Sequence, residues 1–193
     1  KMHVLLTRNI EDSIELIQKL KSNNIKVSNL PLLKIKKKNY NQINVNSFDT
    51  VIFTSSNSIK FLDLKNINKN ILCFCVGSST EKTARSNGFQ NIIAADGNVR
   101  NLKELIQQNL SIKDKKVLYV SSEIVSYPLD KELISEGFNV KRLVNYSVKH
   151  NENLDLSFLQ SLKKDIPDLV YVYSENSVKS FLNLIKKYEL VDY

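Results

Sequence analysis

The chain has 193 residues, with 28 lysines and arginines against 20 aspartates and glutamates, so its formal net charge is +8. A hydrophobic fraction of 42% with 25% charged residues is ordinary for a globular protein and excludes a disordered, collagen-like or coiled-coil chain. No apolar run approaches the roughly 20 residues that a membrane-spanning helix needs. The first residues lack the pattern of a signal peptide, so we expect a cytoplasmic protein that does not bind membranes.

Short apolar runs alternate with amphipathic helical patterns along most of the chain. The expected strands cover residues 4–7, 51–54, 72–76, 92–94, 117–120, 140–148 and 169–173. The expected helices cover residues 10–20, 55–62, 78–88, 98–110, 126–136, 156–162 and 175–188. Residues 27–35 read as an extended edge or crossing segment because Pro31 cannot donate to a strand ladder, and residues 34–42 read as a polar loop with solvated lysines. Such alternation predicts an α/β fold with parallel sheets covered on both faces.

Several helix ends are marked by their residues. Ser78 to Glu81 has the spacing of a capping box with Ser78 as the N-cap, and Gly88 is the expected stop of that helix. Asn98 is the expected N-cap of the next helix.

Cys73 and Cys75 occupy alternate positions of one apolar run, so on a strand they face the same side. We therefore expect reduced core residues. A metal site is not expected, because it would need more ligands and the only histidines are His3 and His150. The positive charge favours an acidic ligand, but the lysines are scattered and no nucleic-acid-binding module is recognisable, so no nucleic acid partner is expected.

Small polar residues gather where expected strands end: at residues 7–8, 54–57, 77–80, 121–122 and 174–176. One interpretation is that these residues only cap helices, because serine, threonine and asparagine are common helix caps. The other interpretation is that they line a ligand site, because ligands of parallel α/β sheets bind beyond the carboxyl ends of the strands, beside helix N-termini.

The sequence contains an internal repeat. Residues 49–60 align without gaps to residues 168–179, and Val4-Leu5 pairs more loosely with Val117-Leu118. The order of these segments suggests two similar α/β domains built from one ancestral unit. Two such domains would form an interdomain cleft suited to a ligand.

In their order and spacing, several short segments resemble the uroporphyrinogen-III synthase family. They are residues 5–8, 29–32, 49–59, 76–80, 137–146 and 168–181. The resemblance implies two parallel-sheet, flavodoxin-like domains joined by a two-stranded linker. The first domain is expected to be discontinuous, with residues 1–33 and 148–193, and the second to comprise residues 34–147.

The resemblance also implies a reaction. Hydroxymethylbilane, a linear tetrapyrrole octa-carboxylate, loses water and cyclises to uroporphyrinogen III with inversion of ring D, a step of haem biosynthesis that needs no metal or cofactor. A monomer acting on this small molecule is the expected form. Net positive charge and helix N-termini suit such an anion.

By the same resemblance, Tyr146 corresponds to the tyrosine proposed to assist departure of the hydroxyl group, and Thr80 to a threonine of the Val-Gly-x-x-Thr motif. The residues expected to bind substrate are Arg8, Thr54, Ser55, Ser56, Gly77, Ser78, Ser79 and Ser174. Structural roles stay open: Thr80 as a first-turn residue, Tyr146 as a packing residue and Arg8 as a surface cation.

Two features depart from the family pattern. Residues 121–123, Ser-Ser-Glu, stand where the family usually has Arg-Gly, which places an acid near an expected anion site. The chain stops at Tyr193, where the family continues through further strands and helices, so we expect part of the discontinuous domain to be missing. The alternative function is a two-domain protein that binds an anionic ligand without catalysis.

Overall fold

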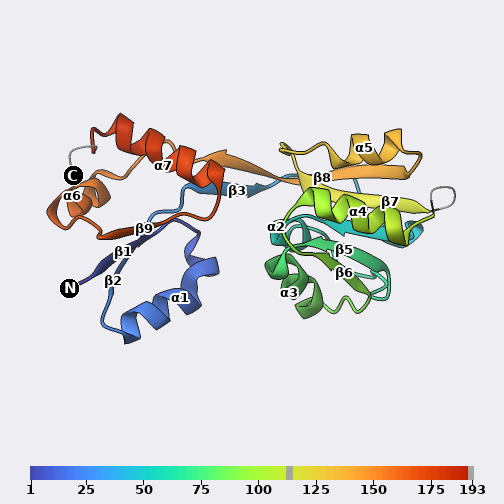
Figure 1. The fold of residues 1–193 in the computed structure, drawn as a ribbon, viewed down its shortest axis with the longest axis horizontal. Coiled ribbons are helices and arrows are strands. Elements are labelled where there is room, and N and C mark those ends of the chain that lie inside the picture. The colour runs from blue at the N-terminus through green and yellow to red at the C-terminus, as the bar shows by residue number, and fades with distance from the viewer. Residues whose placement is uncertain (112–114, 191–193) are drawn as a thin grey trace. The chain divides into compact units, whose positions relative to one another are not determined.

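The computed structural model describes residues 1–111 and 115–190 and divides the chain into two compact units. Unit 1 consists of Lys1–Ile35 and Val148–Tyr193, and unit 2 consists of Lys36–Ser147. Figure 1 shows that each unit is a sheet with helices packed against it. Among the helices in the described ranges, none is long and apolar enough to cross a lipid bilayer.

Unit 1 is built on a parallel sheet with the order β2-β1-β9. Its strands are β1 (His3–Leu6), β2 (Lys26–Asn29) and β9 (Leu169–Tyr171). Its helices are α1 (Ile10–Ser22), α6 (Leu156–Lys164) and α7 (Glu175–Lys187). The central strand β1 is buried along its whole length, and Leu5 packs in a core with Leu162 and Leu184.

The larger sheet has the order β3-β8-β7-β4-β5-β6. Its strands are β3 (Leu33–Lys37), β4 (Thr50–Phe53), β5 (Leu72–Val76), β6 (Ile92–Ala95), β7 (Lys116–Ser122) and β8 (Asn139–His150). Its helices are α2 (Ser56–Lys60), α3 (Ser78–Ser86), α4 (Val99–Asn109) and α5 (Leu129–Ser135), with a 3-10 turn η1 (Val45–Ser47). Both β3 and β8 carry the chain across the boundary between the two units.

Apolar side chains cover both faces of this sheet. Along β4, Phe53 packs into one core with Ile59 of α2, whereas Ile52 packs into the other with Leu102 of α4. This alternation follows from the two-residue period of a strand, and burial on both faces is what parallel strands require. The predicted α/β fold with parallel sheets is confirmed. Cys73 and Cys75 are buried free thiols on the same face, as predicted.

The predicted N-cap of one helix matches the structure, and that of another does not. The Asn98 side chain accepts hydrogen bonds from the N–H groups of Arg100 and Asn101. The prediction that Ser78 is an N-cap is wrong. Gly77 is the N-cap of α3, with φ 78° and ψ 154°, and no side chain caps this helix. The glycine conformation turns the chain into the helix one residue earlier, so Ser78 is already helical.

The loop predicted for residues 34–42 is partly wrong because β3 runs from Leu33 to Lys37. Leu33 and Ile35 alternate there with exposed lysines, which is the two-residue period of a strand. The extended segment predicted for residues 27–35 is interrupted between β2 and β3, and Pro31 lies in that interruption.

The internal repeat is reproduced in the strand pairing of the two units. In unit 2, Thr50 pairs with Val117 across β4 and β7. In unit 1, Leu169 pairs with Val4 across β9 and β1. These are equivalent positions of the repeat, so the register of the two sheets is the same at this pair of strands.

The aspartate before β4 and the aspartate before β9 make the same pair of hydrogen bonds. Asp49 donates its N–H to the Lys116 carbonyl at 2.9 Å, and its carboxylate accepts the Lys116 N–H at 2.8 Å. Asp168 donates its N–H to the His3 carbonyl at 2.9 Å, and its carboxylate accepts the His3 N–H at 2.7 Å. The shared geometry supports the interpretation that both units descend from one.

Candidate functional site

The polar strand ends of unit 2 meet at one edge of its sheet. Strands β4, β5 and β7 are parallel neighbours, so the residues that follow them lie at the same edge. Ser55 is the N-cap of α2, and its Oγ accepts the Asn57 N–H at 3.2 Å. Ser56 Oγ lies 3.2 Å from Ser79 Oγ in the first turn of α3. The structure therefore brings the predicted residues after β4 together with those after β5.

The first turn of α3 presents backbone donors at this edge. The first helical hydrogen bond to the N-cap runs from the Glu81 N–H to the Gly77 carbonyl at 3.1 Å. The N–H groups of residues 78–80 precede it and have no acceptor one turn back in the helix. Ser78 and Ser79 are exposed, whereas Thr80 is only 4% exposed. A ligand would therefore reach the backbone donors and Ser79 before the Thr80 hydroxyl.

Tyr146 lies at the same edge because of an irregularity in β8. Ser121 of β7 pairs with Val144, but Ser122 pairs with Tyr146, so Asn145 is an extra residue in the ladder. Such a bulge bends a strand and re-aims a side chain. Asn145 is fully buried, and its Nδ2 donates to the Ser58 carbonyl at 2.8 Å.

The Tyr146 phenol is buried beside two hydroxyl groups. The side chain is 5% exposed, and its ring centre lies 6.2 Å from that of Phe61. Burial raises the pKa of Tyr146 above its ordinary value, and hydrogen bonding with Ser55 and Ser122 works in the opposite direction with a smaller effect. The phenol is therefore protonated at neutral pH and is available as a hydrogen-bond donor.

A second buried phenol, Tyr119 of β7, belongs to the same edge. It is 2% exposed, and burial raises its pKa, while a hydrogen bond with Thr54 and the charge of Arg142 lower it. Thr54, which is half-buried after β4, thus lies close enough to Tyr119 to influence its pKa.

Arg142 of β8 contacts the last residues of β7. Its Nε donates to Ser121 Oγ at 2.8 Å, and its Nη2 donates to the carbonyls of Ser122 at 2.8 Å and Glu123 at 3.0 Å. The Glu123 carboxylate forms an ion pair with Lys38. The negative charge of Glu123, which the sequence places near the expected anion site, is thus partly neutralised.

Sequence reasoning missed Tyr119 and Arg142. Tyr119 looked like one more apolar strand residue, and Arg142 like one more cation in an extended segment. Their relation depends on the pairing of Tyr119 with Arg142 across two parallel strands. No local pattern in the sequence specifies that register.

Arg8 and Ser174 lie in unit 1, at the carboxyl ends of the neighbouring parallel strands β1 and β9. The exposed Arg8 guanidinium carbon lies 4.2 Å from the centre of the Tyr173 ring. Ser174 is the N-cap of α7, and its Oγ accepts the Ser177 N–H at 3.1 Å. Both residues thus have structural partners inside unit 1.

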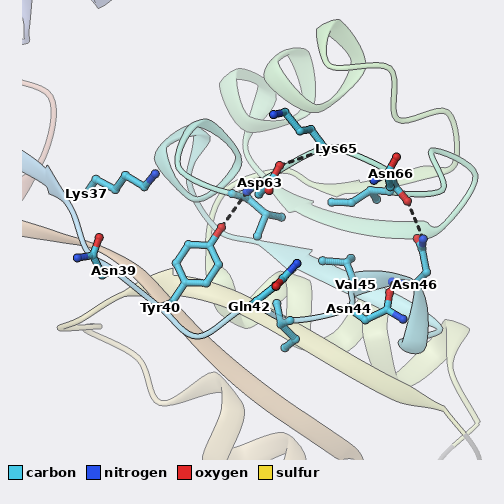
Figure 2. Close-up of a pocket in the computed structure, with 13 residues that line it drawn as sticks. Lys37, Asn39, Tyr40, Gln42, Asn44, Val45, Asn46, Asp63, Lys65 and Asn66 are labelled. Atoms are coloured by element: carbon cyan, nitrogen blue, oxygen red, sulfur yellow. Dashed lines mark hydrogen bonds between the residues drawn. The ribbon is translucent and has the colours of Figure 1, made fainter.

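A hollow of about 840 Å³ lies elsewhere in unit 2, beside the segment that precedes β4. Figure 2 shows Tyr40, whose hydroxyl accepts the Asp63 N–H at 2.8 Å, and Asn46, whose Nδ2 donates to the Asn66 carbonyl at 2.7 Å. The hollow is lined by residues 37, 39–40, 42–46, 62–63 and 65–67. It contains none of the predicted site residues, and the polar loop after β3 was its only signal in the sequence.

The family model for uroporphyrinogen-III synthase HemD matches residues 14–192 of this chain. A curated relative, uncharacterized protein RP474 of Rickettsia prowazekii, is 26% identical over 162 residues, which are 83% of this chain and 54% of that protein. The chain thus spans about half the length of that relative.

Two solved structures share the fold. Uroporphyrinogen-III synthetase from Helicobacter pylori has a TM-score of 0.61 at 21% identity, covering 95% of this chain and 78% of that one. A mutant uroporphyrinogen III synthase from Thermus thermophilus has a TM-score of 0.60 at 13% identity, covering 96% and 77%. With a family match over nearly its whole length, the chain belongs to the uroporphyrinogen-III synthase family.

Proposed function

We propose that this chain forms uroporphyrinogen III from hydroxymethylbilane, with Tyr146 as the residue that assists the loss of water. One observation carries the proposal. A buried, protonated phenol lies beside Ser55 and Ser122 at the edge where α3 presents unpaired backbone donors. Family membership supplies the reaction class, and this arrangement supplies residues that suit it.

In the proposed first step, the phenol donates a hydrogen bond to the hydroxyl group on ring A. The carbon–oxygen bond breaks, and the hydroxyl leaves as water with the proton from the phenol. The pyrrole nitrogen of ring A supplies the electron pair and loses its own proton, which returns to the phenolate, so that an azafulvene forms. Ring D then attacks this electrophile through its substituted carbon and gives a spiro intermediate, whose rearrangement inverts the ring. General-acid assistance of this kind contributes about 10²–10⁴-fold.

The remaining residues are proposed to hold carboxylates. Helix N-terminal N–H groups and hydroxyl groups bind such anions well. Candidates in unit 2 are Thr54, Ser55, Ser56, Gly77, Ser78, Ser79 and Thr80. From unit 1 we propose Arg8 and Ser174. The net charge of +8 favours encounter with an octa-anion.

We also propose that β3 and β8 serve as the two-stranded linker between a discontinuous first domain and the second, and that the protein acts as a monomer in the cytoplasm. Two buried free thiols on one strand support a reducing compartment. We propose the same activity, the formation of uroporphyrinogen III, for the whole protein.

The test is incubation with freshly generated hydroxymethylbilane, followed by separation of the product isomers. The type I isomer forms without an enzyme, so type III in excess of a protein-free control supports the proposal. Type I alone, at the protein-free rate, would contradict it. Binding of uroporphyrinogen III without turnover would favour the alternative of a non-catalytic anion-binding protein.

A further inference from the structure

We propose that Arg142 is a positioning residue for Tyr146, acting through the carboxyl end of β7. This inference rests on the proposed function, because it concerns how the phenol is held for that reaction. Arg142 does not need to touch the substrate for this role. Within the described residues, its side-chain hydrogen bonds go to the three residues that end β7 and begin the following turn.

The guanidinium group fixes this strand end at three points. It donates to the Ser121 hydroxyl and to the carbonyls of Ser122 and Glu123, at 2.8 to 3.0 Å. The planar arginine side chain carries five N–H donors in a fixed fork, so it satisfies several acceptors with one orientation. A lysine ammonium cannot reproduce this fixed arrangement.

The same strand end also holds Tyr146. The Glu123 N–H donates to the Tyr146 carbonyl at 2.9 Å, and Ser122 is the ladder partner of Tyr146. The Ser122 hydroxyl also lies close enough to the phenol to lower the pKa of Tyr146. Arg142 and Tyr146 thus both contact Ser122 and Glu123. If the guanidinium is removed, the end of β7 loses the contacts that oppose a shift of Ser122, and the phenol loses a fixed partner.

The internal repeat gives independent support. Ser121 stands four residues after Val117, as Arg8 stands four residues after Val4, so Ser121 and Arg8 are equivalent positions. In unit 1, the guanidinium comes from Arg8 itself. In unit 2, serine occupies that position, and Arg142 of the neighbouring strand places its guanidinium on the serine hydroxyl. A guanidinium at the end of this strand is therefore present in both copies.

The test compares Arg142→Gln and Arg142→Lys with the matched control Lys141→Gln, which removes one exposed positive charge from the same strand. A positional error of about 1 Å at a reacting group can cost about 100-fold in rate. We expect both Arg142 variants to lower kcat for type III formation at least tenfold, with KM changed less than threefold. Lys141→Gln should behave as the unmodified chain does. Equal losses in Arg142→Gln and Lys141→Gln, or kcat within twofold in a folded Arg142→Gln, would overturn the proposal.

Amide hydrogen exchange provides a readout that does not depend on turnover. The Glu123 amide should exchange at least tenfold faster in Arg142→Gln, because its hydrogen bond to the Tyr146 carbonyl is no longer held in place. The Leu118 amide, in the middle of β7, reports whether the strand as a whole is intact and should be unchanged. Unchanged exchange at Glu123 would overturn the positioning role. If the unmodified chain forms no type III isomer, the proposed function fails, whereas this exchange measurement still decides whether Arg142 holds the strand end.

Discussion

Ser56 Oγ lies 3.2 Å from Ser79 Oγ, so the first turns of α2 and α3 adjoin at the carboxyl edge of the unit 2 sheet. Ser79 is exposed and stands among backbone donors that have no acceptor within the helix. This pair is where the proposed carboxylate binding can be tested with small changes.

Replacing Ser79 with alanine should weaken substrate binding more than it slows the reaction. A hydrogen bond to a charged group contributes about 1.5–3 kcal/mol, so an increase in KM of about 10- to 150-fold is expected, with kcat within about threefold. Steady-state kinetics of type III formation measure both constants. Ser86→Ala, at the other end of α3, is the matched control and should leave KM unchanged. An unchanged KM in Ser79→Ala would remove this hydroxyl from the binding site.

Gly77 is predicted to resist substitution for a backbone reason. Its φ of 78° and ψ of 154° lie in a region that only glycine populates readily, although an added Cβ would meet no atom within 4 Å. Gly77→Ala should therefore lower the free energy of unfolding by about 1–3 kcal/mol. Urea denaturation measures this loss. Gly88→Asn is the comparison, since asparagine tolerates a positive φ at a helix end, and it should cost less. A loss below about 0.5 kcal/mol in Gly77→Ala would contradict the backbone argument.

The buried phenols predict how stability depends on alkaline pH. Burial raises the folded-state pKa of Tyr119 and Tyr146 above 10, so the folded state binds their protons more tightly than the unfolded state. Their contribution is fully present below pH 10 and is lost as the pH rises through the folded values. Denaturation at several pH values should show stability declining above pH 10 by less in Tyr146→Phe than in the unmodified chain. Identical slopes would contradict the shifted pKa of Tyr146.

The two cysteines should be unreactive in the folded protein. Burial raises the pKa of the Cys75 thiol to about 12, and it raises that of Cys73 as well, so neither forms thiolate near pH 8. Iodoacetamide should label both thiols only after denaturation, as mass spectrometry would show. Labelling of either cysteine under native conditions within minutes would show that this core opens.

Much of the scaffold could be predicted because its signals are local. The strand at Leu72–Val76 and the Asn98 cap depend on neighbouring residues, and both agree with the structure. The predicted start of α3 is wrong because the conformation of Gly77, not the serine spacing, decides where the helix begins.

The candidate site was harder to predict than the scaffold. Ser55 and Ser56 are visible as polar residues after a strand, and the structure places them beside Tyr146 and Ser79. No such local pattern in the sequence identifies Arg142. Its role depends on which strand lies beside β7 and in which register, and on a one-residue irregularity at Asn145. Those are properties of the folded sheet.

The proposed reaction depends on the Tyr146 phenol, which assists departure of the hydroxyl group. The most direct measurement is the rate of type III formation by Tyr146→Phe, which removes one oxygen from a buried side chain. We expect the rate to fall at least about 10-fold, as the loss of a general acid implies, with the melting temperature changed by only a few degrees. Tyr171→Phe, at a half-exposed tyrosine of β9, should keep the unmodified rate. A rate for Tyr146→Phe within twofold of the unmodified chain would contradict this role of Tyr146.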